Sequence, residues 1–258
     1  MAAPVVTLHD IRKSFTNGTL ALDRLNLNVG EGEFLTFLGP SGCGKSTALR
    51  LIAGLIEPTS GAVDWRDGAR PEVGFVFQEP TLMPWANVFD NVFLPLRLRG
   101  VPKSNARGQI EEALSLVGLK DFANAYPREL SGGMKMRVSI ARALVLKPGL
   151  LLLDEPFAAL DEITRLKLND DVLRIKAELG TTVIFVTHSV YESVYLSSRV
   201  VVFAARPGRI IAALDINAPM PRTECLRLSQ DYADQCRQAS AALQRAIELG
   251  GDAIGAHR

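Results

Sequence analysis

A glycine-rich segment at residues 39–47 carries the residues whose chemistry is easiest to assign. Its sequence, Gly39-Pro-Ser-Gly-Cys-Gly-Lys-Ser-Thr47, fits the phosphate-binding pattern G-x-x-x-x-G-K-[ST]. Backbone N–H groups of such a loop point at phosphate, and Lys45 adds a positive charge. Ser46 is placed to offer its hydroxyl to Mg²⁺. The segment predicts nucleotide binding; the alternative is a glycine-rich turn that fits the pattern by accident.

Two adjacent carboxylates, Asp154 and Glu155, follow the apolar run Leu150–Leu153. Such a run is typical of a central parallel strand that is buried on both faces. Ligands of open α/β sheets bind at the carboxyl ends of these strands. We therefore expect Asp154 to hold Mg²⁺, directly or through water, and Glu155 to orient or deprotonate an attacking water. The alternative is a turn that merely ends the strand.

The elements that must position these residues can be predicted from apolar patterning. Residues 33–38 are expected to form a buried strand and residues 46–53 a helix, which places the glycine-rich loop at a helix N-terminus. A further apolar strand is predicted at 181–186, and His188 follows it. A lone histidine after a strand is more often an ordinary turn residue, so the pattern alone leaves the role of His188 open.

A second helix start also offers an anion site. Ser131 is a favourable N-cap, and Ser131-Gly132-Gly133 is expected to open a helix from Met134 to Leu146. The backbone N–H groups at a helix start bind anions readily. The alternative is a well-capped helix that binds nothing.

Together these segments resemble the ABC (ATP-binding cassette) ATPase family over about residues 5–215. The motifs that carry the resemblance are Leu130-Ser-Gly-Gly-Met-Lys-Met-Arg137, Leu150–Pro156, Gln78, Ala158-Ala-Leu-Asp161 and His188. Phe15 lies where the family places an aromatic ring against adenine. The resemblance implies an α/β P-loop NTPase fold with a parallel-sheet core, an antiparallel β subdomain and a helical signature subdomain.

The resemblance also implies the roles of individual residues. Glu155 and His188 would be catalytic, and His188 would contact the γ-phosphate and the attacking water. Mg²⁺ would be the cofactor, held by Ser46, Gln78 and Asp154, with ATP as the substrate. ATP would be bound by Phe15, Gly39, Pro40, Ser41, Gly42, Cys43, Gly44, Lys45, Ser46, Thr47 and Gln78. Cross-subunit and D-loop contacts would come from Ser131, Gly132, Gly133, Met134 and Asp161, because the family works as a head-to-tail dimer.

The chain departs from the family pattern at four positions. Met134 and Met136 replace glutamines, Ala158 replaces the D-loop serine, and Phe15 replaces the stacking tyrosine. Phe15 keeps a π-face. Met134 and Ala158 lose hydrogen-bonding capacity near the dimer seam, which leaves their effect on turnover open, but the essential lysine, carboxylates and histidine are present.

The length fits one α/β unit with an inserted subdomain, and the resemblance implies one ABC ATPase domain over residues 4–235. A helical subdomain is expected at about 85–145, and strands within 4–32 and 61–77 would form the antiparallel subdomain. Residues 200–214 are expected to form a hairpin that turns at 206–208. A helical tail over 222–250 is expected to pack on the core, with Leu228, Tyr232, Ala239, Leu243 and Ile247 on one face and an end at Gly250-Gly251.

Composition limits the partners and the location. The 258 residues carry a net charge of +1, so no dominant nucleic-acid surface is expected. The three cysteines form no disulfide framework, and Cys43 in the phosphate loop is expected to react with a bulky thiol reagent that blocks nucleotide entry. No signal peptide or membrane span is predicted. The expected location is therefore the cytoplasmic face of the inner membrane, with attachment through a partner.

The segment after Gln78 favours a transport function. Leu82, Met83, Trp85 and Phe89 are apolar residues in a loop-rich stretch, where the family docks a coupling helix of the permease; packing within the insertion is the alternative. The sequence of this stretch, together with residues 187–196 and 205–209, resembles the nitrate/sulfonate/taurine importer subfamily, which includes ATPases for pyrimidine-type thiamine precursors. The implied partners are a second copy of the chain, a transmembrane permease and, indirectly, a periplasmic or lipid-anchored solute-binding protein.

Two other classes of function remain as alternatives. A soluble ABC ATPase of DNA repair or translation usually fuses two cassettes or inserts a coiled coil, and neither feature is present here. A nucleotide-sensing module without turnover is disfavoured by the intact Glu155 and His188.

Overall fold

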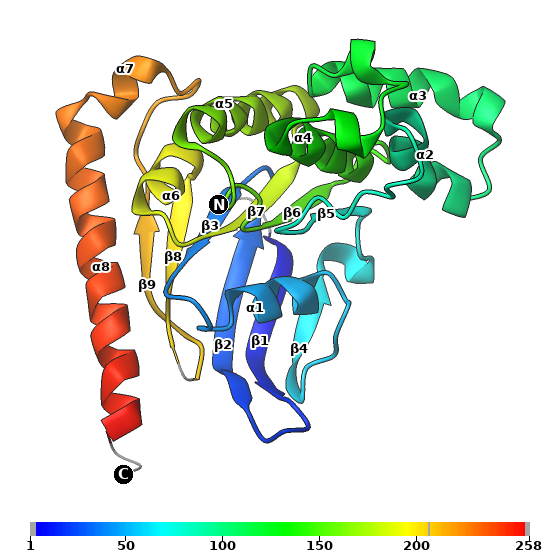
Figure 1. Cartoon of the computed structure of the whole chain (residues 1–258). Coiled ribbons are helices and arrows are strands. Elements are labelled where there is room, and N and C mark those ends of the chain that lie inside the picture. The colour runs from blue at the N-terminus through cyan, green and yellow to red at the C-terminus, as the bar shows by residue number, and fades with distance from the viewer. Residues whose placement is uncertain (1–3, 206, 256–258) are drawn as a thin grey trace. The chain divides into compact units, whose positions relative to one another are not determined.

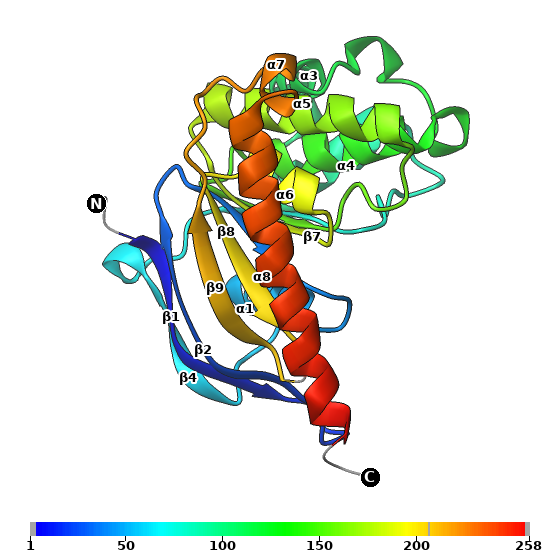
Figure 2. The same cartoon turned by 90° about the vertical axis from the view of Figure 1, so that its left-hand side faces the viewer.

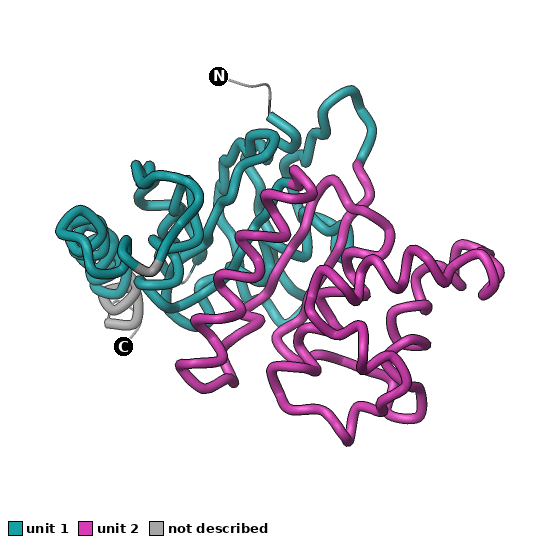
Figure 3. The backbone as a smooth tube through the Cα atoms, turned by 90° about the horizontal axis from the view of Figure 1, so that it is seen from above, with its two compact units in different colours: residues 1–70, 182–258 teal, residues 71–181 magenta. Residues whose placement is uncertain are grey.

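The computed structural model describes residues 4–205 and 207–255 and divides into two compact units. Residues 1–70 and 182–258 make up the first unit, and residues 71–181 make up the second (Figure 3). Within the described residues, none of the helices combines the length and the apolar character that a membrane span requires.

An antiparallel sheet lies in the first unit, in the strand order β2-β1-β4 (Figure 1). Its strands are β1 (Pro4–Ser14), β2 (Leu20–Gly30) and β4 (Ser60–Trp65), and a 3-10 turn (Arg66–Gly68) follows β4. Side chains alternate along β2 between buried and exposed positions, as expected for a sheet with one face on the core. The prediction of antiparallel strands within residues 4–32 is confirmed.

The same unit contains parallel strands that position the phosphate loop. Strand β3 (Phe34–Leu38) pairs in parallel with β7 (Thr182–Thr187) on one side and with β8 (Arg199–Ala204) on the other. Every residue of β3 and β7 is buried, because both faces of the sheet are covered. Helix α1 (Lys45–Ile52) follows β3, and α6 (Val190–Leu196) follows β7.

Strand β9 (Arg209–Asp215) runs antiparallel to β8 and completes the predicted hairpin. Pro207 and Gly208 lie in its turn, while Arg206 lies outside the described residues. The hairpin prediction is confirmed for the described part of the turn.

The C-terminal segment forms α7 (Glu224–Arg227) and the long helix α8 (Gln230–Gly255). Figure 2 shows α8 running along β8 and β9, and it also contacts α6. The predicted end at Gly250-Gly251 is wrong, because the helix continues to Gly255. The predicted apolar face is also partly wrong: Leu228 precedes α8 and is 87% exposed, and Ile247 is 54% exposed. The buried side chains are mostly small: Tyr232, Cys236, Ala239, Ala242 and Ala246.

The second unit combines one parallel strand pair with helices. Strand β5 (Val73–Val76) pairs in parallel with β6 (Leu150–Asp154). The expectation that the strands within 61–77 all join the antiparallel sheet is therefore wrong for β5, whose partner is the buried β6. The helices are α2 (Val88–Leu98), α3 (Lys103–Leu116), α4 (Gly132–Leu144) and α5 (Glu162–Leu179), with 3-10 turns at Lys120–Phe122 and Pro127–Glu129.

Candidate functional site

The phosphate loop leaves the first unit's sheet directly after β3 and turns sharply into α1. Gly42 and Gly44 have φ angles of 76° and 93°, a region that side-chain-bearing residues rarely adopt. A Cβ atom on Gly44 would lie 2.8 Å from the carbonyl oxygen of Ala21, and one on Gly39 would lie 2.7 Å from that of Phe203. The loop therefore needs glycine at residue 42 for its φ angle. It needs glycine at residues 39 and 44 because the backbone of β8 and of β2 approaches it closely there.

Lys45 places a positive charge inside the loop. Its side chain is buried, and Nζ donates hydrogen bonds to the carbonyl oxygens of Gly39 at 2.8 Å and Pro40 at 2.9 Å. No side chain caps α1, and its first turn contains no acidic residue. The positive end of the α1 dipole and the ammonium group of Lys45 thus lie in the same loop, which suits an anion such as phosphate.

Cys43 is enclosed by the same loop. Its side chain is fully buried, and Sγ lies 3.7 Å from Nζ of Lys45. Burial raises the pKa of the Cys43 thiol, although the nearby ammonium of Lys45 works in the opposite direction. The predicted access of a bulky thiol reagent to Cys43 is therefore wrong for the folded chain, because the sulfur is both covered and protonated at neutral pH.

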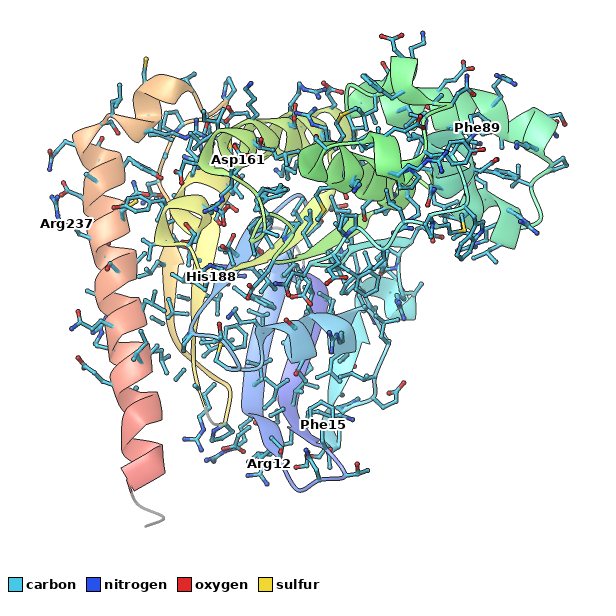
Figure 4. The ribbon with its side chains drawn as sticks, viewed as in Figure 1. Arg12, Phe15, Phe89, Asp161, His188 and Arg237 are labelled. Carbon is cyan, nitrogen blue, oxygen red and sulfur yellow. The ribbon has the colours of Figure 1, made fainter. Side chains whose placement is uncertain are left out.

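His188 lies at the same edge of the sheet as the phosphate loop (Figure 4). Leu38 and Thr187 are register partners in the parallel pair β3–β7. Gly39 and His188 are the next residues along each strand, so both leave the sheet at its carboxyl edge. The side chain of His188 is exposed. The first unit therefore brings together two of the predicted site segments.

Phe15 lies in the turn between β1 and β2, and its ring is 41% exposed. Nζ of Lys13 lies 5.6 Å from the ring centroid, and the backbone N–H of Phe15 donates to the carbonyl oxygen of Thr19. Residue Ala21, which approaches Gly44, follows this turn by only two residues. An exposed aromatic face is thus available near the start of the strand that touches the phosphate loop.

Ion pairs around the buried carboxylate of Asp23 fix the strands around this turn. Asp23 on β2 is 4% exposed, and its two carboxylate oxygens contact Nε of Arg12 and Nη2 of Arg209, both at 2.8 Å. Burial acts to raise the pKa of Asp23, but the hydrogen bonds and charges of the two arginines outweigh it and hold the pKa below its usual value. The cluster ties β1, β2 and β9 together.

In the second unit, Gln78 and the two carboxylates lie at one edge of the β5–β6 pair. Val76 and Leu153 are register partners, so Gln78 follows β5 at the edge where Asp154 ends β6 and Glu155 leaves it. Asp154 is buried, whereas Gln78 is exposed. Glu155 has a φ of 45°, which is uncommon for a residue other than glycine and typical of functional sites.

Arg142 holds the segment after Gln78, and sequence analysis did not single it out. Its guanidinium donates to the carbonyl oxygens of Pro80 and Thr81 and to Oγ1 of Thr81, each at 2.9 Å. Burial lowers the pKa of Arg142 from its ordinary value. Arg142 lies on α4, the helix that Ser131 opens, so a single helix links the Ser131 turn to this loop. Nothing in the sequence singles out Arg142, because α4 also carries Lys135 and Arg137.

The Ser131 turn contacts the segment around Asp161. The backbone N–H of Met134 donates to Oγ of Ser131 at 3.3 Å, which confirms the predicted cap. A Cβ atom on Gly133 would lie 2.6 Å from Cγ2 of Thr164. Asp161 caps α5 by accepting from the backbone N–H of Thr164 at 2.9 Å, and this bond lowers the pKa of its carboxyl group. The second unit therefore brings the starts of α4 and α5 together.

Comparisons with known proteins agree with these motifs. The sequence profile of the family described as ABC transporter matches residues 22–158. An ABC transporter ATP-binding protein of Methanocaldococcus jannaschii is 52% identical over 80% of this chain and 80% of its own length. A taurine import ATP-binding protein of Rhizobium johnstonii is 44% identical over 89% of this chain and 91% of its own. An aliphatic sulfonates import ATP-binding protein of Bacillus cereus is 41% identical over 85% of this chain and 89% of its own.

A solved structure supports the same likeness at the level of the fold. The chain is similar to a dimeric ATP-binding cassette in a post-hydrolysis state, bound to ADP and Pi, with a TM-score of 0.73 and 33% identity. The match covers 83% of this chain and 100% of that one.

Proposed function

The chain belongs to the ABC transporter family, and on that premise we propose that it is the ATPase that powers import of an organic sulfonate such as taurine. The observation that carries the ATPase assignment is the shared edge of β3 and β7, where the phosphate loop with its buried Lys45 and the exposed His188 leave the sheet. The sulfonate assignment is supported by two relatives, which are named as import ATP-binding proteins for aliphatic sulfonates and for taurine, itself a sulfonate.

The first unit supplies phosphate binding in this proposal. The backbone N–H groups at the start of α1 and Nζ of Lys45 bind the β- and γ-phosphates of ATP. Nζ exchanges its bonds to the carbonyl oxygens of Gly39 and Pro40 for bonds to phosphate oxygens. Phe15 offers its exposed ring to adenine, and His188 contacts the γ-phosphate.

The second unit supplies the carboxylate chemistry. Glu155 orients or deprotonates the attacking water, and Asp154 and Gln78 would hold Mg²⁺. Their carboxylate and amide oxygens fit Mg²⁺, which takes one or two carboxylates together with substrate phosphates, and Ser46 in the first unit offers a hydroxyl oxygen of the same kind. Mg²⁺, when bound, neutralises the charge that develops on the phosphoryl group.

We propose that two copies of the chain complete each site. The start of α4, at Ser131 to Met134, where Ser131 and Gly132 are exposed, faces the γ-phosphate that the other copy holds. The similar solved cassette is a dimer, which supports this arrangement. We further propose that both units belong to one ABC ATPase domain over 4–235, and that the segment 222–250 is a tail of that domain.

The partners beyond the dimer are a transmembrane permease and a solute-binding protein that delivers the sulfonate to it. Attachment to the cytoplasmic face of the membrane comes through the permease. Trp85, in the segment after Gln78, is 77% exposed and is the anchor that we propose for the permease.

Growth on a sulfonate as the only sulfur source tests the proposal. A strain that lacks this chain should fail to grow on taurine or an alkanesulfonate, yet should grow on sulfate. Wild-type chain should restore growth, and Glu155→Gln should not. Normal growth of the deletion strain on sulfonates, together with failure on nitrate or on a pyrimidine-type thiamine precursor, would reassign the solute while leaving the ATPase assignment intact.

A further inference from the structure

The turn that carries His188 is closed by hydrogen bonds on both sides of the histidine. Oγ1 of Thr187, the residue before it, donates to Oε2 of Glu192 at 2.5 Å. The backbone N–H of Ser189, the residue after it, donates to Oγ1 of Thr187 at 3.0 Å. The Thr187 hydroxyl therefore links the residue before His188 to the residue after it, and its own hydrogen is directed to Glu192.

The carboxyl group of Glu192 determines which way the Thr187 hydroxyl donates and accepts its hydrogen bonds. A threonine hydroxyl has one hydrogen to donate and lone pairs that accept. Because its hydrogen goes to a carboxyl oxygen of Glu192, the hydroxyl is left to accept from the N–H of Ser189. Thr187 is 3% exposed and Glu192 is 8% exposed, so water does not compete freely for these bonds.

The backbone of Glu192 is also held, by hydrogen bonds at the start of α6. Glu192 lies in the first turn of α6, and its backbone N–H donates to Oγ of Ser189, the N-cap, at 3.3 Å. The backbone N–H of Ser193 donates to the carbonyl oxygen of Ser189 at 3.1 Å. The end of β7, the turn and the start of α6 are thus joined, and His188 is the one residue of the turn that projects an exposed imidazole from it.

We propose that Glu192 is a positioning residue for ATP hydrolysis, which acts by fixing the turn that presents His188 to the γ-phosphate. This inference rests on the proposed function of His188. Glu192 itself is buried, and its carboxyl group accepts the hydrogen bond from Oγ1 of Thr187. Loss of its carboxyl group leaves the Thr187 hydroxyl free to reorient, and the backbone at Ser189 then loses a defined acceptor.

Steady-state ATPase kinetics of four single variants and one double variant test the proposal. Glu192→Ala should lower kcat roughly 10- to 100-fold, because a misplacement of about 1 Å at a reacting centre costs on that order. KM for ATP should change by less than about threefold, since the phosphate loop is untouched. Glu192→Gln keeps an acceptor oxygen and should retain most of the wild-type kcat.

A matched control is available on the same helix. Ser193 is fully buried, and its Oγ donates to the carbonyl oxygen of Val190 at 2.7 Å, but it has no hydrogen bond to Thr187 or Ser189 through that hydroxyl. Ser193→Ala removes one buried hydrogen bond from α6 and should leave kcat within about twofold of wild type. Equal losses of kcat in Glu192→Ala and Ser193→Ala would overturn the positioning role in favour of general loosening of α6.

A double-mutant cycle separates this inference from the proposed function. If Glu192 acts through His188, Glu192→Ala should cost almost nothing further in a His188→Ala background. Full, additive loss in that background would overturn the inference while leaving the catalytic role of His188 intact. If His188→Ala alone keeps wild-type kcat, the proposed catalytic role of His188 is wrong, and the inference that rests on it is overturned as well.

Discussion

Leu38 and Thr187 face each other as register partners at the ends of two buried parallel strands. The residues that follow them, Gly39 and His188, come from segments almost 150 positions apart in the sequence and leave the sheet at one edge. Parallel strands place all their carboxyl ends on the same side, so a phosphate loop after one strand and a histidine after its neighbour leave the sheet next to each other.

The first prediction concerns Trp85 and the permease. Trp85→Ala should leave the thermal unfolding and the ATP affinity of the isolated chain nearly unchanged, because the side chain is 77% exposed and packs little within its own unit. Solute uptake by the assembled transporter should be lost or uncoupled from ATP hydrolysis. Uptake assays in vesicles, combined with a thermal melt, measure both effects.

Phe89 provides the buried counterpart to Trp85. It lies on α2 at 9% exposure, with Lys103 and Arg107 above its ring. Phe89→Ala should lower the free energy of unfolding by about 3 kcal/mol, the low end for a buried phenylalanine. Similar melts for the two variants would argue that Trp85 also packs in the core and has no docking role.

A second prediction concerns the dimer. In a Glu155→Gln background, Mg-ATP should shift the chain from monomer to dimer on size exclusion, because ATP joins one phosphate loop to the start of α4 in the other copy. Adding Ser131→Arg places bulk and charge at that exposed helix start and should abolish the shift. Persistence of the ATP-dependent dimer in the double variant would exclude a cross-subunit role for Ser131.

The three cysteines should differ in reactivity. Cys225 is exposed, whereas Cys43 and Cys236 are buried, and burial raises the pKa of both buried thiols. Native protein at neutral pH should therefore take up maleimide at Cys225 alone and keep its ATPase activity, with the buried thiols reacting only after unfolding. Mass spectrometry locates the label. Rapid ATP-protected labelling of Cys43 in native protein would contradict the buried geometry.

Acid should weaken the contribution of the Asp23 cluster. The pKa of Asp23 is lowered in the folded chain, so its stabilising contribution is complete above the unfolded pKa of about 3.9 and is lost as the pH falls through the folded value. The destabilisation caused by Asp23→Asn should be equal at pH 7 and pH 5 and smaller below about pH 4. Urea unfolding at each pH measures it. A destabilisation that grows toward acid would contradict the assigned sign.

The strand–loop–helix around Lys45 was predictable because a single short segment specifies it. The glycine-rich pattern is contiguous in the sequence, and the flanking apolar runs define β3 and α1 to within one or two residues. The cap at Ser131 was predictable in the same way, since a serine before two glycines satisfies the N–H groups of the next turn.

The elements that were predicted wrongly depend on contacts distant in sequence. The pairing of β5 with β6 follows from burial beside Leu150–Leu153, which no local pattern in 73–76 reveals. The face of α8 consists largely of alanines, which packing selects and hydropathy barely marks. Arg142 acts on backbone carbonyls about 60 residues away, and such contacts leave no spacing rule to find.

The ATPase function is tested most directly by comparing ATP binding with ATP hydrolysis in two variants of the isolated chain. Glu155→Gln should retain Mg-ATP with near wild-type affinity and hydrolyse it at least about 100-fold more slowly, because water activation fails. Lys45→Ala should lose productive ATP binding, because the positive charge in the phosphate loop is gone. Near-normal turnover by Glu155→Gln would contradict the assignment of Glu155 as the residue that activates the attacking water.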